Sequence, residues 1–219
     1  MIIAAKCAPE KRYLSAIRKA GIRAVELYLP EKALNNPDKI IRICKGYAFR
    51  YAVHSPRNGL NIFRLSYLCE AINAEIAVFH NNYWEDEWQE IASGLKNIKV
   101  CIENIASADE PVKFMRRFGM GMCLDLEHLQ MQCGGVYEEE FIRIAKQASH
   151  VHLTGYSHGS SNWHTHIHHD PQHGAFMLKM LKKAGYTGLV VSEAEARYQT
   201  YNDFLKLNKF FKDANNENK

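Results

Sequence analysis

The residues of this sequence that could carry out chemistry are its histidines and the carboxylates near them. Eleven histidines are present, and eight of them fall between residues 150 and 173. The other three are His54 and His80, each at the end of a short apolar run, and His128, which follows Asp125 by three residues. Imidazole is the commonest metal ligand in proteins and titrates close to neutral pH. Histidines placed repeatedly at the ends of apolar runs and beside carboxylates predict a metal site.

Polar residues end successive apolar segments at nearly regular intervals. The set is Glu26, His54, His80, Glu103, Asp125, His152 and Glu193. The steps between them are 28, 26, 23, 22, 27 and 41 residues. The last and longest step contains the histidine-rich segment, which we interpret as an extended loop inserted in an otherwise minimal repeating unit.

The apolar segments have the composition of parallel strands buried on both faces. We predict eight strands, at Ile2–Ala5, Arg23–Leu27, Arg50–His54, Ile76–His80, Lys99–Glu103, Gly121–Asp125, His150–Leu153 and Gly188–Glu193. Helical patterns lie between them, and three of these patterns stop at Gly21, Gly119 and Gly185. The alternation predicts one α/β domain, a (β/α)8 TIM barrel over residues 1–211, with a polar tail at 212–219 that we expect to fray. A doubly wound sheet is the alternative, and the even spacing favours a closed barrel.

In a barrel, the carboxyl ends of all strands form one rim, and active sites lie there. A single strand-terminal histidine or carboxylate commonly caps the next helix or bonds a backbone group. Six such residues from consecutive strands in the same phase, from His54 to Glu193 in the set above, are much harder to explain in that way. Burying two glutamates and an aspartate together is costly unless a cation pairs with them.

Composition sets broad limits on the partners and the location of the protein. The chain has 47% hydrophobic and 24% charged residues and a net charge of +4, which is ordinary for a globular protein and demands no polyanionic partner. Six scattered cysteines without a C-x-x-C pair predict reduced thiols and a cytoplasmic protein. No secretory signal pattern is present, and no apolar run approaches the ~18 residues of a membrane span. A homo-oligomer is compatible with the sequence.

The ordered set of strand-end residues resembles the xylose-isomerase-like TIM barrel superfamily, which includes sugar isomerases and epimerases and the endonuclease IV type of apurinic-site nuclease (AP endonuclease family 2). The resemblance covers essentially the whole chain. It implies that Glu103, Asp125, His152 and Glu193 hold a shared divalent metal ion. Three carboxylates and one imidazole suit Zn²⁺, Mn²⁺, Co²⁺ or Mg²⁺. The segments that carry it are Ala24-Val-Glu-Leu27, Val53-His-Ser-Pro56, Val78-Phe-His80, Cys101-Ile-Glu-Asn104, Leu124-Asp-Leu-Glu-His128, Val151-His-Leu153 and Val191-Ser-Glu193.

The preferred function under this resemblance is isomerisation or epimerisation of a small carbohydrate. The metal would stabilise an enediolate, with Glu103 and Glu193 moving the proton from opposite sides of the sugar. Glu26 either contacts the substrate or forms an ion pair inside the barrel. Further candidate substrate contacts, each of which could equally be a packed or solvated side chain, are Tyr83, Trp84, His158, Trp163 and Arg197. His158 stands where epimerases of this type often have an arginine.

The alternative function is that of a three-zinc nuclease acting on abasic DNA, and only this alternative involves a nucleic-acid partner. It implies His54 and His80 as ligands of one zinc, and His128 with His166 and His168 as ligands of another. His166 stands where these nucleases have an aspartate, and the short loops and the lack of a basic stripe favour the isomerase. A second alternative is a non-catalytic barrel whose histidine-rich loop binds metal through its composition alone.

Overall fold

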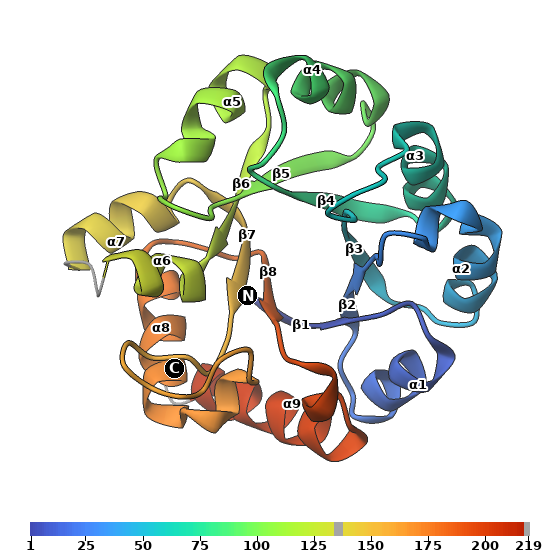
Figure 1. Ribbon diagram of the computed structural model, residues 1–219. Helices are drawn as coiled ribbons and strands as arrows, with labels where there is room; N and C mark the ends of the chain where they lie inside the picture. The colour runs from blue at the N-terminus through green and yellow to red at the C-terminus, as the bar shows by residue number, and fades with distance from the viewer. Residues whose placement is uncertain (134–137, 217–219) are drawn as a thin grey trace.

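The strands of this protein close into a single ring. The computed structural model describes residues 1–133 and 138–216, and in it each strand pairs in parallel with its neighbours in the sequence while the last pairs with the first (Figure 1). The predicted (β/α)8 barrel is therefore confirmed. The strands are β1 (Ile2–Cys7), β2 (Ala24–Tyr28), β3 (Arg50–His54), β4 (Ala74–His80), β5 (Lys99–Glu103), β6 (Gly121–Asp125), β7 (Ala148–Leu153) and β8 (Leu189–Ser192).

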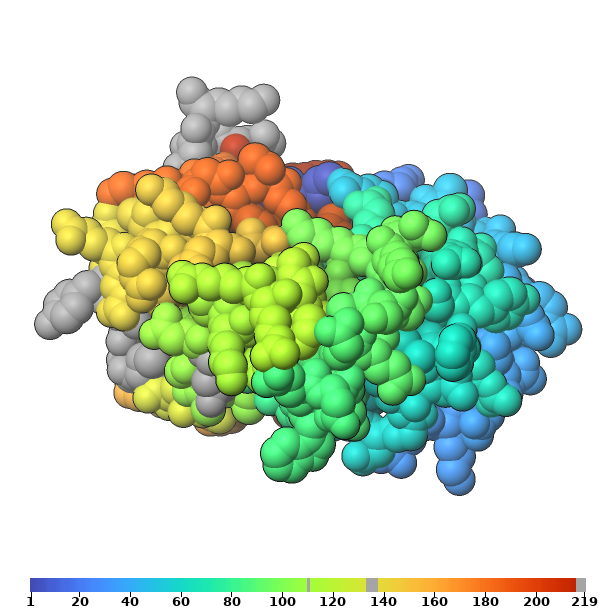
Figure 2. Space-filling model, turned by 90° about the horizontal axis from the view of Figure 1, so that it is seen from above, coloured from blue at the N-terminus to red at the C-terminus, as the bar shows by residue number. Residues whose placement is uncertain are grey.

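Helices surround the ring of strands on its outer side (Figure 1). In the perpendicular space-filling view of Figure 2, successive segments lie side by side in chain order, from blue through green to yellow. The helices are α1 (Lys11–Lys19), α2 (Pro37–Cys44), α3 (Ile62–Ala71), α4 (Glu85–Gly94), α5 (Glu110–Phe118), α6 (Leu126–Cys133), α7 (Glu138–Ala145), α8 (Pro171–Lys183) and α9 (Tyr201–Asn216), with short 3-10 turns η1 (Ala33–Asn35), η2 (Ile167–His169) and η3 (Ala196–Tyr198).

Local sequence signals set the ends of several helices. The side chain of Asp170 accepts a hydrogen bond from the backbone N–H of His173 at 3.0 Å, and Pro171 occupies the first position of α8. Both features satisfy or remove backbone donors that a helix start leaves free. Gly119 ends α5 in the left-handed conformation, with φ of 67°, which glycine adopts without steric cost.

The barrel has two separate apolar cores. The larger one lies between the strands and the helices and includes long buried side chains such as Leu14, Phe79 and Trp88. The smaller one fills the inside of the ring with compact residues. Its members are Ala4, Ala24, Ala52, Ile76, Val78, Cys101, Cys123, Leu189 and Val191. Because side chains alternate along a strand, these residues identify which positions of each strand point to the barrel axis.

The end of the chain contributes more to the fold than its composition indicates. Helix α9 continues to Asn216, so it includes part of the segment that we predict as a polar tail from residue 212. Residues 217–219 lie outside the described part of the chain.

Across the described residues, no helix is long and apolar enough to cross a membrane. Five cysteines are buried free thiols, as predicted, and the side chain of Cys133 lies outside the described part.

The long loop after β7 is fastened to the barrel by a buried histidine. His166 Nε2 lies 3.1 Å from the carbonyl oxygen of Tyr198, and Nδ1 lies 3.0 Å from Ser192 Oγ. A carbonyl can only accept, so Nε2 donates and Nδ1 accepts from the hydroxyl. The ring also packs edge-on against Phe204 at 5.5 Å between centroids. His166 therefore joins the loop to β8 and α9 in its neutral form, and burial lowers its pKa to about 4.

This burial predicts an acid-sensitive fold. Below the ordinary histidine pKa of 6.5, residue 166 binds a proton in the unfolded chain, whereas in the folded protein it stays neutral down to about pH 4. The stability of the fold therefore falls as the pH drops through that window. In metal-free protein, His166→Gln should reduce the slope of the unfolding free energy against pH by up to about 1.4 kcal/mol per pH unit. Urea unfolding at several pH values measures this slope. The exposed His158→Gln is the matched control, and equal slopes in wild type and His166→Gln would refute the assignment.

Candidate metal centre at the barrel mouth

Strand periodicity brings the predicted strand-end residues onto the barrel axis. Glu103 lies two residues after Cys101 and Asp125 two residues after Cys123, and both cysteines belong to the inner core. Side chains two positions apart on a strand point the same way. Val191 and Glu193 have the same spacing at the end of β8. The carboxylates therefore form the next layer inside the ring, at the carboxyl ends of the strands.

Four of these side chains form one cluster of potential metal ligands. One donor atom from each of Glu103, Asp125, His152 and Glu193 lies within 4.8 Å of the others. His152 Nδ1 is central, at 2.8 Å from Glu103 Oε1, 3.2 Å from Glu193 Oε2 and 3.5 Å from Asp125 Oδ2. The cluster is buried except for the side chain of Glu193, which is 23% exposed. The site is thus open to solvent on the side of Glu193.

Glu26 fixes the orientation of the central imidazole. His152 Nε2 lies 3.1 Å from Glu26 Oε2, and the same oxygen lies 2.6 Å from His150 Nε2. An ionised carboxylate only accepts hydrogen bonds, so Nε2 of His152 carries a hydrogen. Its Nδ1 therefore presents to three carboxylates either a lone pair or a second proton. A lone pair in that position repels its neighbours unless a cation lies between them.

The charges inside the barrel are unequal. Lys6 Nζ lies 2.8 Å from Glu193 and 3.4 Å from Glu26, and Glu103 and Asp125 bring two further carboxylates to the same region. Burial lowers the pKa of Lys6, but Glu193 and Glu26 outweigh it and raise the pKa above its ordinary value. Negative charge still exceeds positive charge when the histidines are neutral. The donor set therefore fits a divalent cation, and its oxygen-rich character suits Zn²⁺, Mn²⁺, Co²⁺ or Mg²⁺.

A second donor set shares Glu103 with the first. His54 Nε2 and His80 Nε2 lie 3.1 Å and 3.3 Å from Glu103 Oε2, the oxygen that does not face His152. His54 Nδ1 lies 3.2 Å from the carbonyl oxygen of Ser55, which can only accept, so this nitrogen carries a hydrogen. Burial lowers the pKa of His80 to about 4, which keeps its ring neutral. Glu103 could therefore bridge two cations, one on each of its oxygens.

Asn104 holds the neighbouring aspartate in place. Its side-chain oxygen accepts from the Asp125 backbone N–H at 2.7 Å, and its Nδ2 donates to the Asp125 carbonyl at 3.0 Å. The backbone N–H of His128 donates to Asp125 Oδ1 at 2.8 Å, and the His128 ring lies 2.9 Å from the Asn104 carbonyl oxygen. His128 belongs to none of the multi-residue donor clusters found among the described residues. In this structure it buttresses Asp125 and Asn104.

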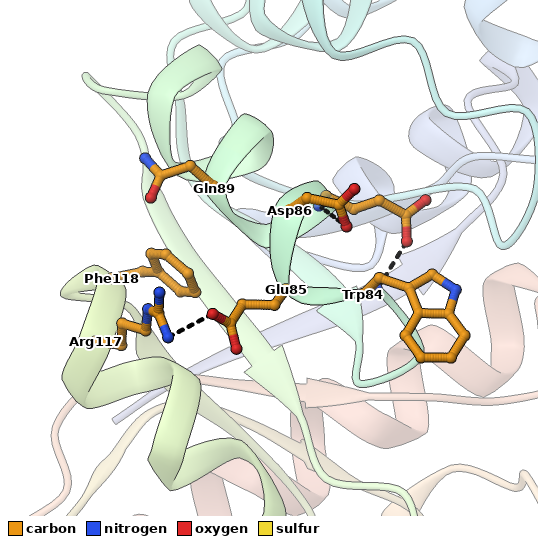
Figure 3. Close-up of a pocket in the computed structure, with 7 residues that line it drawn as sticks. Trp84, Glu85, Asp86, Gln89, Arg117 and Phe118 are labelled. Atoms are coloured by element: carbon orange, nitrogen blue, oxygen red, sulfur yellow. Dashed lines mark hydrogen bonds and ion pairs between the residues drawn. The ribbon is translucent and has the colours of Figure 1, made fainter.

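A cavity opens beside Glu193. It measures ≈ 460 Å³, and Lys6, Tyr28, Arg57 and His164 are among its lining residues. A larger hollow of ≈ 850 Å³ lies against the first turn of α4 and the end of α5, where Glu85 pairs with Arg117 (Figure 3). No ligand of the barrel mouth lines that hollow. The cavity beside Glu193 is the one that adjoins the metal ligands.

The aromatic side chains proposed as substrate contacts lie elsewhere. Tyr83 packs edge-on against Phe79 and Trp88, between β4 and the helices. Trp84 is 80% exposed and lines the hollow on α4 that Figure 3 shows. Trp163 packs against Tyr156, with 4.3 Å between ring centroids. None of these aromatic residues lines the cavity beside Glu193.

The polar candidates of the long loop and of β8 also lie apart from the cavity. His158 is exposed at a turn, and the side chain of Arg197 is 66% exposed and pairs with Glu195 at 2.8 Å. His166 and His168 face β8 and α9, and His166 has both ring nitrogens engaged. The sequence places these residues after the correct strands, but the direction of a loop side chain depends on contacts that spacing does not reveal.

One pair beside the cavity is visible only in the structure, and its histidine, His164, lines the cavity. Glu127, which is buried, lies 3.2 Å from His164 Nδ1 and accepts from the His164 backbone N–H at 3.1 Å. The hydroxyl of Thr154 donates to the same carboxylate at 2.6 Å. His164 adopts a φ of 42°, a left-handed conformation that is uncommon outside glycine. The proximity of Glu127 to Asp125 and His128 was the available sequence signal, and it identifies Glu127 but not its partner.

Comparison with known proteins relates the fold of this chain to those of several solved structures. No curated protein matches the chain. Among solved structures, a D-allulose 3-epimerase from Methylomonas sp. is 11% identical with a TM-score of 0.67, over 98% of both chains. SacUVDE is 13% identical with a TM-score of 0.60, over 98% of this chain and 99% of its own. Phosphoribosyl anthranilate isomerase from Thermotoga maritima is 12% identical with a TM-score of 0.62, over 97% and 100%.

Identities this low establish a common fold and nothing further about activity. The family assignment comes from the sequence itself. The sequence profile described as xylose isomerase-like TIM barrel matches residues 14–213, which is most of the chain. The protein belongs to the xylose isomerase-like TIM barrel family.

Proposed function

We propose that the protein is a divalent-metal-dependent isomerase or epimerase of a small sugar or sugar-like hydroxy-carbonyl compound. The observation that carries this proposal is the position of Glu193, which belongs to the four-residue donor cluster and also lines the cavity of ≈ 460 Å³. Sites that bind small molecules typically have volumes of roughly 300–1,000 Å³. A sugar in this cavity would lie against a carboxylate that can move a proton.

The two glutamates supply the acid–base pair that such a reaction requires. Both carboxylates contact His152 Nδ1, Glu103 at 2.8 Å and Glu193 at 3.2 Å, so they approach one point from different strands. One would remove the proton from the carbon next to the carbonyl, and the other would return a proton to the opposite face of the resulting enediolate. A divalent cation held by Glu103, Asp125, His152 and Glu193 would act as a Lewis acid on the substrate oxygens.

Other residues of the cavity could orient a hydroxylated substrate. Lys6 contacts Glu193 at 2.8 Å and also lines the cavity, so its ammonium group can donate to a substrate oxygen while holding the glutamate. Arg57 lines the same cavity from the loop after β3. Tyr28 offers a ring that is 39% exposed, which is suited to packing against the apolar face of a sugar.

The acid–base assignment predicts the effect of neutralising either glutamate. Glu103→Gln and Glu193→Gln should each reduce turnover by at least ~10²-fold, because a carboxamide cannot accept the proton. The assay is deuterium incorporation from D₂O at the carbon next to the carbonyl, followed by ¹H NMR over a panel of ketoses and aldoses. Glu75→Gln, which changes an exposed glutamate at the amino end of β4 that pairs with Arg50, is the matched control and should keep wild-type exchange. Wild-type exchange in Glu193→Gln would remove this residue from the mechanism.

A second function is favoured by one specific observation, the His54–His80–Glu103 donor set. Two cations sharing one carboxylate are typical of enzymes that hydrolyse phosphoesters. This candidate is an endonuclease IV-like phosphoesterase acting on abasic DNA. It predicts incision of a duplex containing one abasic site, which His54→Ala and His80→Ala should each abolish. If the wild-type protein with zinc leaves that duplex intact, the nuclease candidate fails.

Metal content separates the candidates before any substrate is known. In protein purified without a histidine tag or added metal, the isomerase predicts that about one divalent ion per chain depends on Glu103, and the nuclease predicts that about two do, mostly zinc. Inductively coupled plasma mass spectrometry gives the count, and Glu103→Gln identifies the ions that depend on the shared carboxylate. If Glu103→Gln retains every ion, the barrel mouth holds no metal. Metal binding without exchange or incision would favour a non-catalytic barrel.

A further inference from the structure

A separate group of metal-ligating side chains lies where the loop after β7 meets the last helix. It consists of His168 and His169 in η2 and of Asp203 in the first turn of α9. One donor atom from each residue lies within 4.8 Å of the other two. The group shares no residue with the donor sets at the barrel mouth. Helix α9 runs beside this part of the chain in Figure 1.

The fold positions each of the three side chains. His168 stacks on the buried ring of His166, with 5.8 Å between centroids and 20° between planes. Because His166 is held by hydrogen bonds from both ring nitrogens, this contact fixes the position of the His168 ring. His169 packs edge-on against Tyr198 at 4.9 Å. The hydroxyl of Thr200 donates to Asp203 Oδ2 at 2.6 Å, which fixes the carboxylate at the start of α9. Three residues from two elements are thus held facing one another.

One atom of the group requires a partner that the described residues do not supply. His168 Nδ1 is buried and makes no hydrogen bond within residues 1–133 and 138–216. A buried nitrogen without a partner costs free energy. An uncharged imidazole can donate the lone pair of such a nitrogen to a metal ion. Asp203 adds the negative charge that balances part of a cation.

We propose that His168, His169 and Asp203 form a zinc site that ties the loop after β7 to α9. Two imidazoles and one carboxylate are ordinary protein ligands of Zn²⁺, and water would complete a tetrahedral shell. Closing this site would restrain the loop that carries His164 to the cavity beside Glu193. The proposal stands independently of the reaction at the barrel mouth, because it uses none of the same ligands.

The test counts zinc on the full-length chain. Metal-free protein is equilibrated with excess zinc, freed of unbound metal by gel filtration and measured by inductively coupled plasma mass spectrometry. His169→Ala and Asp203→Asn should each bind about one zinc fewer than the wild type. His158→Ala removes an exposed histidine from the same loop and should keep the wild-type count. Zinc should also raise the melting temperature less in the two ligand variants than in wild type.

The two metal proposals fail in different ways. Glu103→Gln should lose zinc from the barrel mouth and retain the ion at His168, His169 and Asp203. If His169→Ala and Asp203→Asn each bind as much zinc as wild type, or if wild type binds no zinc beyond what Glu103→Gln loses, the site on α9 does not exist. The two variants alter different elements, and circular dichroism of the metal-free proteins establishes that each is folded before zinc is counted.

Discussion

The rest of the structure depends on how negative charge is neutralised inside the barrel. Glu26, Glu103, Asp125 and Glu193 converge there, and burying such groups without compensation is costly. His152 lies between Glu26 on one side and the other three on the opposite side. Although burial lowers its pKa, the surrounding negative groups raise the pKa of His152 well above its ordinary value. A proton or a metal ion on Nδ1 serves the same electrostatic purpose, so protonation of this ring and metal affinity are linked.

The small residues of the inner core make room for that polar layer. Ala4, Ala24 and Ala52 fill the ring below Lys6, Glu26 and His54, each two positions further along its strand. Compact side chains in one layer let the longer ones in the next layer reach the axis and meet. The inside of the barrel therefore contributes a modest apolar area, and most hydrophobic stabilisation comes from the outer core between strands and helices.

The strand ends could be predicted from the sequence because each strand is a continuous apolar run that ends at a polar residue, and because these runs recur at nearly regular intervals. The end of the run places residues such as Glu103 and Asp125 at the carboxyl rim of the barrel. Residues beyond the strand ends obey no such rule. Tyr83 follows His80 by three positions, yet it turns outward to pack on Phe79 and Trp88. His166 turns away from the mouth because Ser192 and the Tyr198 carbonyl satisfy both of its nitrogens. Long-range partners of this kind cannot be read from local spacing.

The long loop after β7 is built as part of the site wall, and Glu127 shows why. Glu127 lies one residue before His128, whose backbone N–H donates a hydrogen bond to Asp125. The buried carboxylate of Glu127 accepts a hydrogen bond from the backbone N–H of His164 in the loop. The Glu195 N–H, two residues after Glu193, donates to the His164 carbonyl at 2.8 Å. The left-handed backbone of His164 is thus held from both sides by elements that carry proposed metal ligands. Strained residues persist only where their surroundings over-determine them, and such residues cluster at functional sites. The contacts that retain the strain in His164 therefore also set the distance between the loop and Glu193.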